Sequence, residues 1–313
     1  MLSHMRIGAP AFGALVAIAT IPLAGCGNRE TAPLGALPAQ VRTENLPDAQ
    51  RSYAFTCQNG SVFDCLVYTA GGKLLRTRKH DVESPLGVAA GSDGRLYVAN
   101  EFGSDVLVYS SGGRKLSAVL SNGGNVPIDV AVFHGEVAVS NQHVMTFFSS
   151  GATAPTRTLR APSVLQGTGA AFDPSGNCYW SYYNEVPKLE LVEFVGCKGK
   201  ARVRSVSPGG PYGIAFDGSG NLYYSVFAES RNNGVYRCSG LSSCSLFFEA
   251  AAPEYLNFSQ NFQDLWISVP GGGSPGNALY EIDVASGKVV QEITAGLTPS
   301  NPPTGVAAAP GPF

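Results

Sequence analysis

The chain alternates between short apolar runs and turns rich in Gly, Asp, Ser and Asn. Residues 85–90 read PLGVAA, the turn GSDG follows, and the next apolar run is LYVAN at 96–100. The same order returns at 211–226, which read PYGIAFDGSGNLYYSV. Runs of this length, bounded by Gly and Asx turns, are typical of β-strands and too short for helices. The pattern therefore predicts an all-β protein.

The strand pattern repeats along the chain. Copies of the first strand begin at Pro85, Pro127, Gly167, Pro211, Glu254 and Pro303. They are spaced by roughly 40 to 50 residues, and each complete interval holds four predicted strands, which is the signature of a β-propeller blade. The pattern therefore predicts a propeller of four-stranded blades.

The two ends of the chain each hold part of one more blade. Residues 55–77 align with the later strands of the unit that follows them, with Asp64 matching Asp105, but they have no first strand of their own. Residues 303–313 hold a first strand and nothing after it. A sheet without its inner strand would leave backbone groups unpaired and the ring open. We therefore expect the C-terminal strand to complete the N-terminal blade.

This arrangement predicts a closed ring of six blades in which Val306 lies near Phe55. A seven-bladed ring is the nearest competitor, and the count of units disfavours it. The repeats resemble the NHL type of β-propeller and, more loosely, the senescence-marker/gluconolactonase-like superfamily of six-bladed propellers. The resemblance covers about residues 50 to 313.

The N-terminus has the pattern of a secretory signal. One basic residue, Arg6, precedes an uncharged run over Ile7–Leu23, and small residues lead from there to Cys26. The phrase LAGC at Leu23–Cys26 resembles the lipobox of bacterial lipoproteins, in which the cysteine becomes the lipid-carrying first residue. The alternative is cleavage at a neighbouring small residue, with no role for this cysteine.

The lipobox resemblance implies an order of segments along the chain: a signal peptide over 1–25, a lipidated cysteine and flexible tether over 26–48, and the propeller over 49–313. It also implies attachment to a membrane through the lipid on Cys26. For a Gram-negative cell the resemblance implies sorting to the outer membrane, because Gly27 rather than Asp follows the cysteine. We expect a monomer.

Charge narrows the classes of partner. The 313 residues carry a net charge of −2, only 14% of them are charged, and no run of Lys or Arg occurs. Binding to nucleic acid is therefore not expected.

The cysteines give a test of the strand assignment. Besides Cys26, an even number of cysteines remains, as expected for disulfides in an exported chain. The blade pattern selects three pairings, each within one blade: Cys57 with Cys65, Cys178 with Cys197, and Cys238 with Cys244. No C-x-x-C pair occurs, so a zinc site is disfavoured.

The loops that enter the first strand and leave the second strand share one face of the ring, where a repeat scaffold usually places its function. Four carboxylates from different blades map to this face: Glu101, Asp129, Glu185 and Glu229. Oxygen ligands suit calcium or another hard divalent ion, and the gluconolactonase-like resemblance implies a metal at the channel mouth. Such an ion would polarise a lactone or ester carbonyl. Solvated loop carboxylates are the ordinary alternative.

The same face carries a predicted aromatic group. Its candidate members are Tyr182, Tyr183, Tyr212 and Phe227. They offer an apolar patch for a sugar, a peptide or a protein, whereas packing between blades is the competing interpretation. The repeated strand-end residues Asn59, Asn100 and Asn141 are best interpreted as local caps of backbone turns.

Two functions remain open. The first is a non-enzymatic module, anchored by lipid outside the cytoplasm, that binds a protein or glycan through one loop face and requires no cofactor. The second is a metal-dependent hydrolase or lyase of the gluconolactonase-like type, which rests on the resemblance of fold. No G-x-S-x-G, H-E-x-x-H or phosphate-loop motif supports an enzyme.

Overall fold

The computed structural model describes residues 52–79, 81–185, 188–227, 233–271 and 276–310. Cys26 and the predicted signal and tether lie outside these residues, as does Glu229. The chain divides into two units, 1–39 and 40–313, and every described residue belongs to the second.

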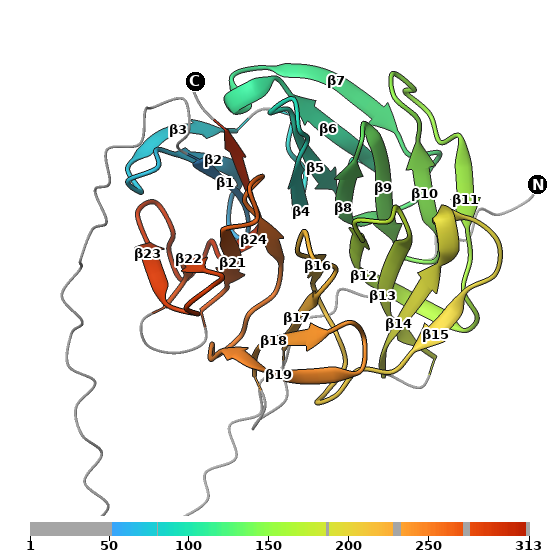
Figure 1. The fold of residues 1–313 in the computed structure, drawn as a ribbon. Helices are drawn as coiled ribbons and strands as arrows, with labels where there is room; N and C mark the ends of the chain where they lie inside the picture. Colours follow the sequence, from blue (N-terminus) through green and yellow to red (C-terminus); the bar gives the residue numbers. More distant parts are fainter. Residues whose placement is uncertain (1–51, 80, 186–187, 228–232, 272–275, 311–313) are drawn as a thin grey trace, which may run out of the picture. The chain divides into compact units, whose positions relative to one another are not determined.

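The second unit is an all-β ring of six blades, each an antiparallel sheet of four strands (Figure 1). Blade 1 consists of β24 (Pro303–Pro310), β1 (Ser52–Asn59), β2 (Phe63–Tyr68) and β3 (Leu74–Arg78). Blade 2 consists of β4 (Pro85–Ala90), β5 (Leu96–Asn100), β6 (Asp105–Tyr109) and β7 (Leu116–Ser121). Blade 3 consists of β8 (Pro127–Phe133), β9 (Glu136–Asn141), β10 (Met145–Phe148) and β11 (Arg157–Leu159).

The remaining blades follow the same order. Blade 4 consists of β12 (Val164–Phe172), β13 (Cys178–Asn184), β14 (Leu189–Phe194) and β15 (Arg202–Arg204). Blade 5 consists of β16 (Ile214–Phe216), β17 (Leu222–Val226), β18 (Gly234–Ser239) and β19 (Ser243–Phe248). Blade 6 consists of β20 (Leu256–Phe258), β21 (Asp264–Val269), β22 (Ala278–Asp283) and β23 (Val289–Ile293). Two short 3₁₀ turns, η2 (Ser111–Gly113) and η3 (Val195–Cys197), complete the described elements.

The ring is closed by the two ends of the propeller, as predicted. Strand β24 pairs antiparallel with β1, so that Phe55 faces Ala307 and Thr56 faces Val306. In Figure 1 the red β24 lies beside the blue β1. The Thr56 hydroxyl donates a 2.5 Å hydrogen bond to the Gly305 carbonyl within the blade. The C-terminal strand therefore supplies the inner strand that blade 1 lacks.

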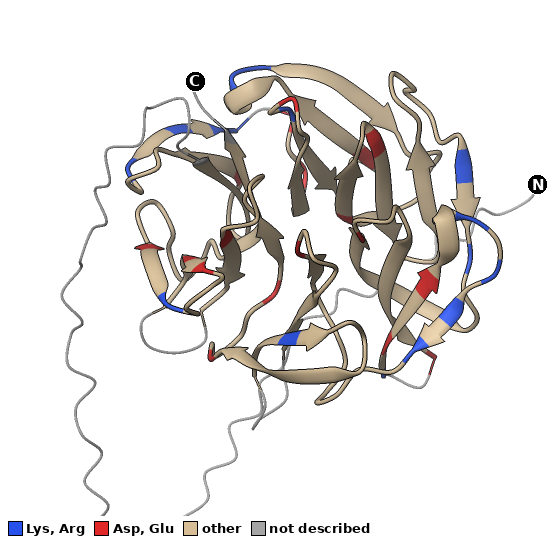
Figure 2. Cartoon of the chain, in the orientation of Figure 1, with Lys and Arg blue, Asp and Glu red and all other residues tan. Residues whose placement is uncertain are grey.

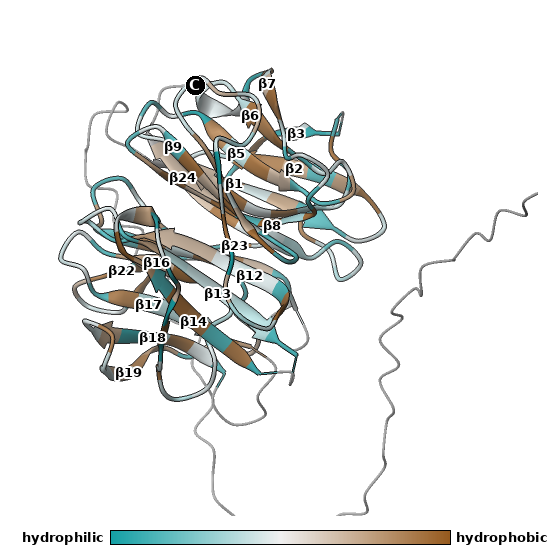
Figure 3. Ribbon diagram, turned by 90° about the vertical axis from the view of Figure 1, so that its right-hand side faces the viewer, coloured by the Kyte–Doolittle hydropathy of each residue, from teal (hydrophilic) through white to brown (hydrophobic). Residues whose placement is uncertain are grey.

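Six apolar clusters fill the spaces between neighbouring blades rather than one central core. Each cluster takes side chains from two adjacent sheets; for example, Trp180 of blade 4 packs with Met145 and Phe147 of blade 3. Figure 3 shows the hydrophobic residues concentrated along the strands and the hydrophilic ones in the turns. A middle strand is therefore buried on both of its faces.

Glycines let the inner strands approach one another closely. A Cβ atom on Gly305 would lie 2.4 Å from the Val88 nitrogen of blade 2, and one on Gly213 would lie 2.3 Å from the Glu254 carbonyl of blade 6. Gly87 and Gly169 face the next blade in the same way. Because the obstructing atoms are mostly backbone, a side chain at these positions would push two blades apart.

At the height of these glycines, hydroxyl groups on the second strands form hydrogen bonds to the neighbouring blades. Ser181 donates 2.6 Å to the Tyr212 carbonyl of blade 5. Ser225 donates to the Glu254 carbonyl of blade 6, and Ser268 donates to the Thr304 carbonyl of β24. Thr304 in turn donates 3.0 Å to the Pro85 carbonyl of blade 2. The C-terminal strand is thus bonded to the blades on both sides of it.

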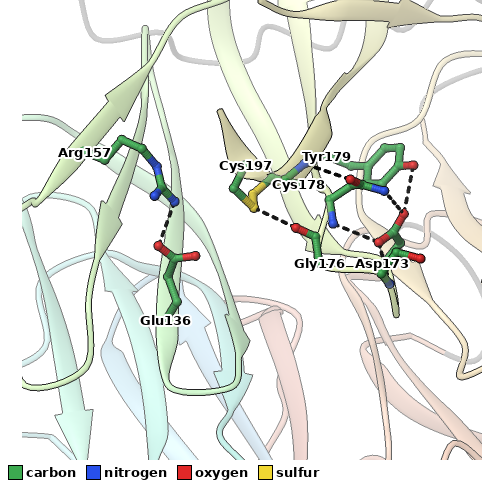
Figure 4. Close-up of a disulfide and its surroundings, with 10 residues drawn as sticks. Glu136, Arg157, Asp173, Gly176, Cys178, Tyr179 and Cys197 are labelled. Carbon is green, nitrogen blue, oxygen red and sulfur yellow. Dashed lines mark hydrogen bonds and ion pairs between the residues drawn. A yellow bond between two sulfur atoms is a disulfide. The ribbon is translucent and has the colours of Figure 1, made fainter. Parts of the chain in front are cut away.

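The three predicted disulfides are present. Cys57–Cys65 and Cys238–Cys244 join facing residues of adjacent strands, and each pair has its Cα atoms 3.9 Å apart. Cys178–Cys197 joins β13 to η3, the turn just after the third strand, with a Cα separation of 4.9 Å (Figure 4). Structural disulfides form in oxidising compartments, and three of them indicate a location outside the cytoplasm.

We expect that Gly305→Ala destabilises the fold, because its new Cβ would meet the backbone of blade 2. The free energy of unfolding in urea should fall by about 1–3 kcal/mol. Gly71→Ala is the matched control, because its Cβ would meet nothing closer than 3.8 Å and its stability should stay near that of the parent. Equal effects of the two substitutions would contradict the close packing of the inner strands.

Candidate functional site

The predicted loop face exists. The start of each inner strand lies beside the end of the second strand, as Pro85 faces Asn100 and Pro127 faces Asn141. We call this end of the ring the loop face. The opposite end, where turns join the first strand to the second, is called the turn face.

Asparagines at the ends of second strands hold the loops in place, as the sequence analysis favoured. The Asn100 side chain accepts a 2.6 Å hydrogen bond from the Glu83 amide and donates 2.8 Å to Asp105. Asn141 donates 2.9 Å to Thr146. Asn184 has the same role and donates 3.0 Å to Glu190; the repeat alignment missed it because β13 is longer than its counterparts.

The three described carboxylates of the predicted metal site have separate surroundings. Glu101 accepts a 2.7 Å hydrogen bond from Ser84 in its own blade, Asp129 lies buried in the channel, and Glu185 is exposed on blade 4. Among the described residues, no three His, Cys, Asp or Glu side chains gather as metal ligands would. The expected calcium-like site is therefore not supported by the described residues, in which Glu101 and Asp129 are bonded to different partners.

The predicted aromatic group is only partly a surface feature. Tyr182 is fully buried, packs on Trp180 with ring centroids 5.3 Å apart, and donates 3.0 Å to Glu190, so its assignment to an exposed patch was wrong. Tyr183 and Phe227 are half-buried and line a cavity of about 500 Å³ at the edge of blades 4 and 5. Tyr212 contacts Phe227, with centroids 5.7 Å apart.

An exposed apolar patch on the loop face, not expected from the sequence, spans blades 1 and 2. It consists of Val62, Phe63 and Phe102, and Phe102 is 67% exposed. The two phenyl rings meet edge to face with centroids 6.2 Å apart. A signal existed in the sequence, since each Phe comes shortly after a strand-end Asn: Phe102 lies in the loop after Asn100, and Phe63 is the first residue of β2, just after the loop that follows Asn59. We call these three residues the loop-face patch.

The backbone beneath the loop-face patch is firmly held. The amides of Glu101 and Phe102 donate to the carbonyls of Ser84 and Glu83, both at 3.1 Å. On the other side, the amide of Val62 donates 3.0 Å to the side chain of Asn301. The patch is thus rigid and depends on the C-terminal segment that closes the ring.

The central channel contains a cavity of about 500 Å³ that opens toward the turn face. The inner strands line it with small residues such as Ala90, Ala131 and Ala215, and phenylalanines such as Phe133 and Phe216 stand at its mouth. Asp129 and Tyr255 lie at its inner end. No Lys or Arg is among the described residues that line it, and Figure 2 shows Lys and Arg on outer strands such as β11 and β15.

Asp129 has an unusual environment. It pairs with Ser140 of the second strand, and the equivalent position in blades 4 and 5 is a glycine, Gly169 or Gly213. Asp129 is only 7% exposed. One carboxylate oxygen accepts a 3.0 Å hydrogen bond from the Ala170 amide of the next blade. Burial raises the pKa of Asp129 to about 7, although the backbone hydrogen bonds act in the opposite direction.

Comparisons with known proteins give the fold and no family. Neither a protein-family model nor a curated protein sequence matches the chain. A chain in the crystal structure of a nidogen/laminin complex has a similar fold, with a TM-score of 0.62 and 14% sequence identity. The match covers 82% of this chain and 98% of that chain. At this identity the likeness establishes the propeller architecture alone.

We expect Asp129→Asn to make the protein more stable, and increasingly so as the pH rises. A carboxyl whose pKa is higher in the folded state binds a proton more tightly there than in the unfolded chain. The stability of the parent therefore falls as the pH rises from about 4 to about 7, and it stays lower above pH 7. Asparagine avoids this loss and still accepts from the Ala170 amide. Each pKa unit corresponds to about 1.4 kcal/mol.

The measurement is urea unfolding of both proteins at pH 4.5 and pH 8, which are experimental conditions chosen on either side of the raised pKa. The stability difference should be larger at pH 8. Asp93→Asn, an exposed aspartate paired with Arg95, is the control and should show no such growth. A constant difference for Asp129→Asn would mean that its carboxyl is not desolvated.

Proposed function

We propose that this protein is a binding module that is tethered to a membrane outside the cytoplasm and holds a partner protein on its loop face. The observation that carries the proposal is the loop-face patch, in which Phe63 and Phe102 stay exposed on a rigid backbone. Exposed aromatic side chains cost solubility, and contiguous ones usually mark interaction surfaces. A preorganised backbone lowers the entropy lost on binding.

Three further points support a module of this kind. The disulfides place the propeller outside the cytoplasm. The fold neighbour comes from a complex of two proteins, which illustrates a use of this architecture. The lipobox-like LAGC at Leu23–Cys26 supports the lipid tether. No helix among the described residues is long and apolar enough to cross a membrane.

The metal-dependent hydrolase is the weaker proposal. It needs several oxygen ligands at one point of the channel mouth. The described residues do not bring such ligands together, and the buried Asp129 is bonded to backbone amides rather than grouped with Glu101 or Glu185. We therefore derive no reaction through a metal.

Site-specific photocrosslinking tests the loop-face proposal. We replace Phe63, Phe102 and Phe262 one at a time with p-benzoylphenylalanine in the cells that make the protein. Phe262 is the matched control because it is 43% exposed but lies in the turn between β20 and β21, on the turn face. Positions 63 and 102 should give the same adduct, and position 262 should not.

A second substitution sharpens the result. Phe63→Glu, introduced together with the probe at 102, should reduce the adduct at least tenfold without lowering the melting temperature, because Phe63 is exposed. No adduct at 63 and 102, or one set of adducts from all three positions, would refute the loop face as the binding surface.

The tether has its own test. Cys26→Ser should abolish labelling by an alkyne-palmitate and release the protein from the membrane fraction, because the lipid attaches to that sulfur. Because Cys26 belongs to the predicted tether and not to the predicted propeller, the substitution should leave the stability of the propeller unchanged. Labelling that persists in the variant would rule out this anchor.

A further inference from the structure

We propose that the channel cavity is a binding site for an organic cation, namely a protonated primary amine that carries an apolar or aromatic body. Asp129 would hold the ammonium group at the inner end. This site lies on the turn face, opposite the loop-face patch, and it does not depend on the proposed function.

The cavity is closed at its inner end. Tyr255 of blade 6 extends across the channel, and its hydroxyl lies 3.5 Å from the carbonyl of Ile128 in blade 3. Tyr212 packs against the Tyr255 ring with centroids 5.7 Å apart, on the side of the loop face. The two tyrosine rings lie between the cavity and the loop face, and the cavity opens toward the turn face. An apolar cavity with a few polar groups at its inner end is the usual form of a small-molecule site.

The charged residues that line the cavity favour a positively charged ligand. The ionisable lining residues are Asp129, Asp173, Asp217, His134 and Tyr255, and no Lys or Arg is described among the lining residues. Asp217 pairs with Arg237 at 3.8 Å, but Asp129 forms no ion pair with a described Lys or Arg. An anion would be repelled by Asp129, whereas a cation would be attracted.

The two aspartates at the mouth already serve the fold. Asp173 accepts from the amides of Ser175 and Asn177, both at 2.9 Å, and holds the turn between β12 and β13; Figure 4 shows it beside Tyr179. Asp217 accepts from the equivalent amides of its own turn. These carboxylates shape the mouth and are not available as the main partner of a ligand.

Asp129 is different because it lies at the inner end of an open cavity and has backbone partners only. Its hydrogen bond to the Ala170 amide satisfies one oxygen, but no described Lys or Arg forms an ion pair with it. A buried carboxylate without a counter-charge is costly. An ammonium group supplies both the charge and three hydrogen-bond donors.

The walls define the rest of the ligand. From Asp129 to Phe133 the strand β8 lines the cavity throughout, a span of about 13 Å at the usual rise per residue. Alanines and valines line the walls, and Phe133 and Phe172 stack at the mouth with centroids 5.4 Å apart. An amine whose aromatic ring lies several methylene groups from the nitrogen reaches from the carboxylate to these rings.

Isothermal titration calorimetry with 4-phenylbutylamine tests the proposal. The neutral 4-phenylbutanol and the anionic 4-phenylbutyrate are probes of the same shape with a different head group. The parent protein should bind the amine with one site, and the alcohol and the carboxylate at least tenfold more weakly. Equal binding of amine and alcohol, or no binding of the amine, would overturn the proposal.

Two variants locate the site. Asp129→Asn keeps an acceptor for the Ala170 amide and removes the charge, so the amine should bind at least tenfold more weakly. Asp93→Asn removes an exposed charge from the turn between β4 and β5 without touching the cavity lining, and its affinity should be unchanged. Equal affinities in the parent and Asp129→Asn would contradict the assignment.

Hydrogen exchange on the parent protein gives the location without any variant. The amine should slow amide exchange at Asp129–His134 and around Tyr255–Phe262, which line the cavity on opposite blades. It should leave the loop at Gly60–Phe63 unaffected. Protection at the loop face instead would place the amine elsewhere and refute the channel site.

Discussion

The pairing of β24 with β1 is the contact on which the rest of this structure depends. It joins residues that lie about 250 positions apart in the chain. Without it blade 1 lacks its inner strand, and blade 6 loses its packing against Val306 and Ala308. The same C-terminal segment carries Asn301, which holds the loop under Phe63, and Thr304, which bonds to blade 2. Ring closure therefore also determines whether the loop-face patch is rigid.

The inner ring explains why the channel holds a cavity. Four blades place a glycine where the inner strands approach most closely, and the other two place Asp129 and Tyr255 there, on opposite sides of the ring. Tyr255 closes the channel, and Asp129 supplies a charged group beside it. Small residues elsewhere on the inner strands leave space for the cavity. A binding site can thus arise from two exceptions to a repeat, with no change in the blade architecture.

The repeat pattern predicted the architecture well because turns, strands and cysteines recur in a fixed order, and closure follows from unpaired backbone groups. It predicted side-chain exposure poorly. Tyr182 is buried because a middle strand of a blade packs against neighbours on both faces, so alternation does not separate core from surface. The sequence did not reveal that Tyr255 stands at a glycine position of the repeat. In the structure Tyr255 pairs with Ser268 as Gly213 pairs with Ser225, whereas the alignment of repeats matched Tyr255 to Tyr212. Phe102 lies in a loop, outside any periodic signal.

Hydrogen exchange measured amide by amide as a function of denaturant tests the closure of the ring most directly, because it reports the free energy at which each strand opens. Closure by β24 predicts that the amides of β24 and β1 open at the same free energy as those of β8, an inner strand in a blade made from one continuous segment. The contrary result is exchange of the β24 amides at a much lower free energy while the β8 amides remain protected. It would show that the other blades stay folded without the C-terminal strand, and it would contradict the account.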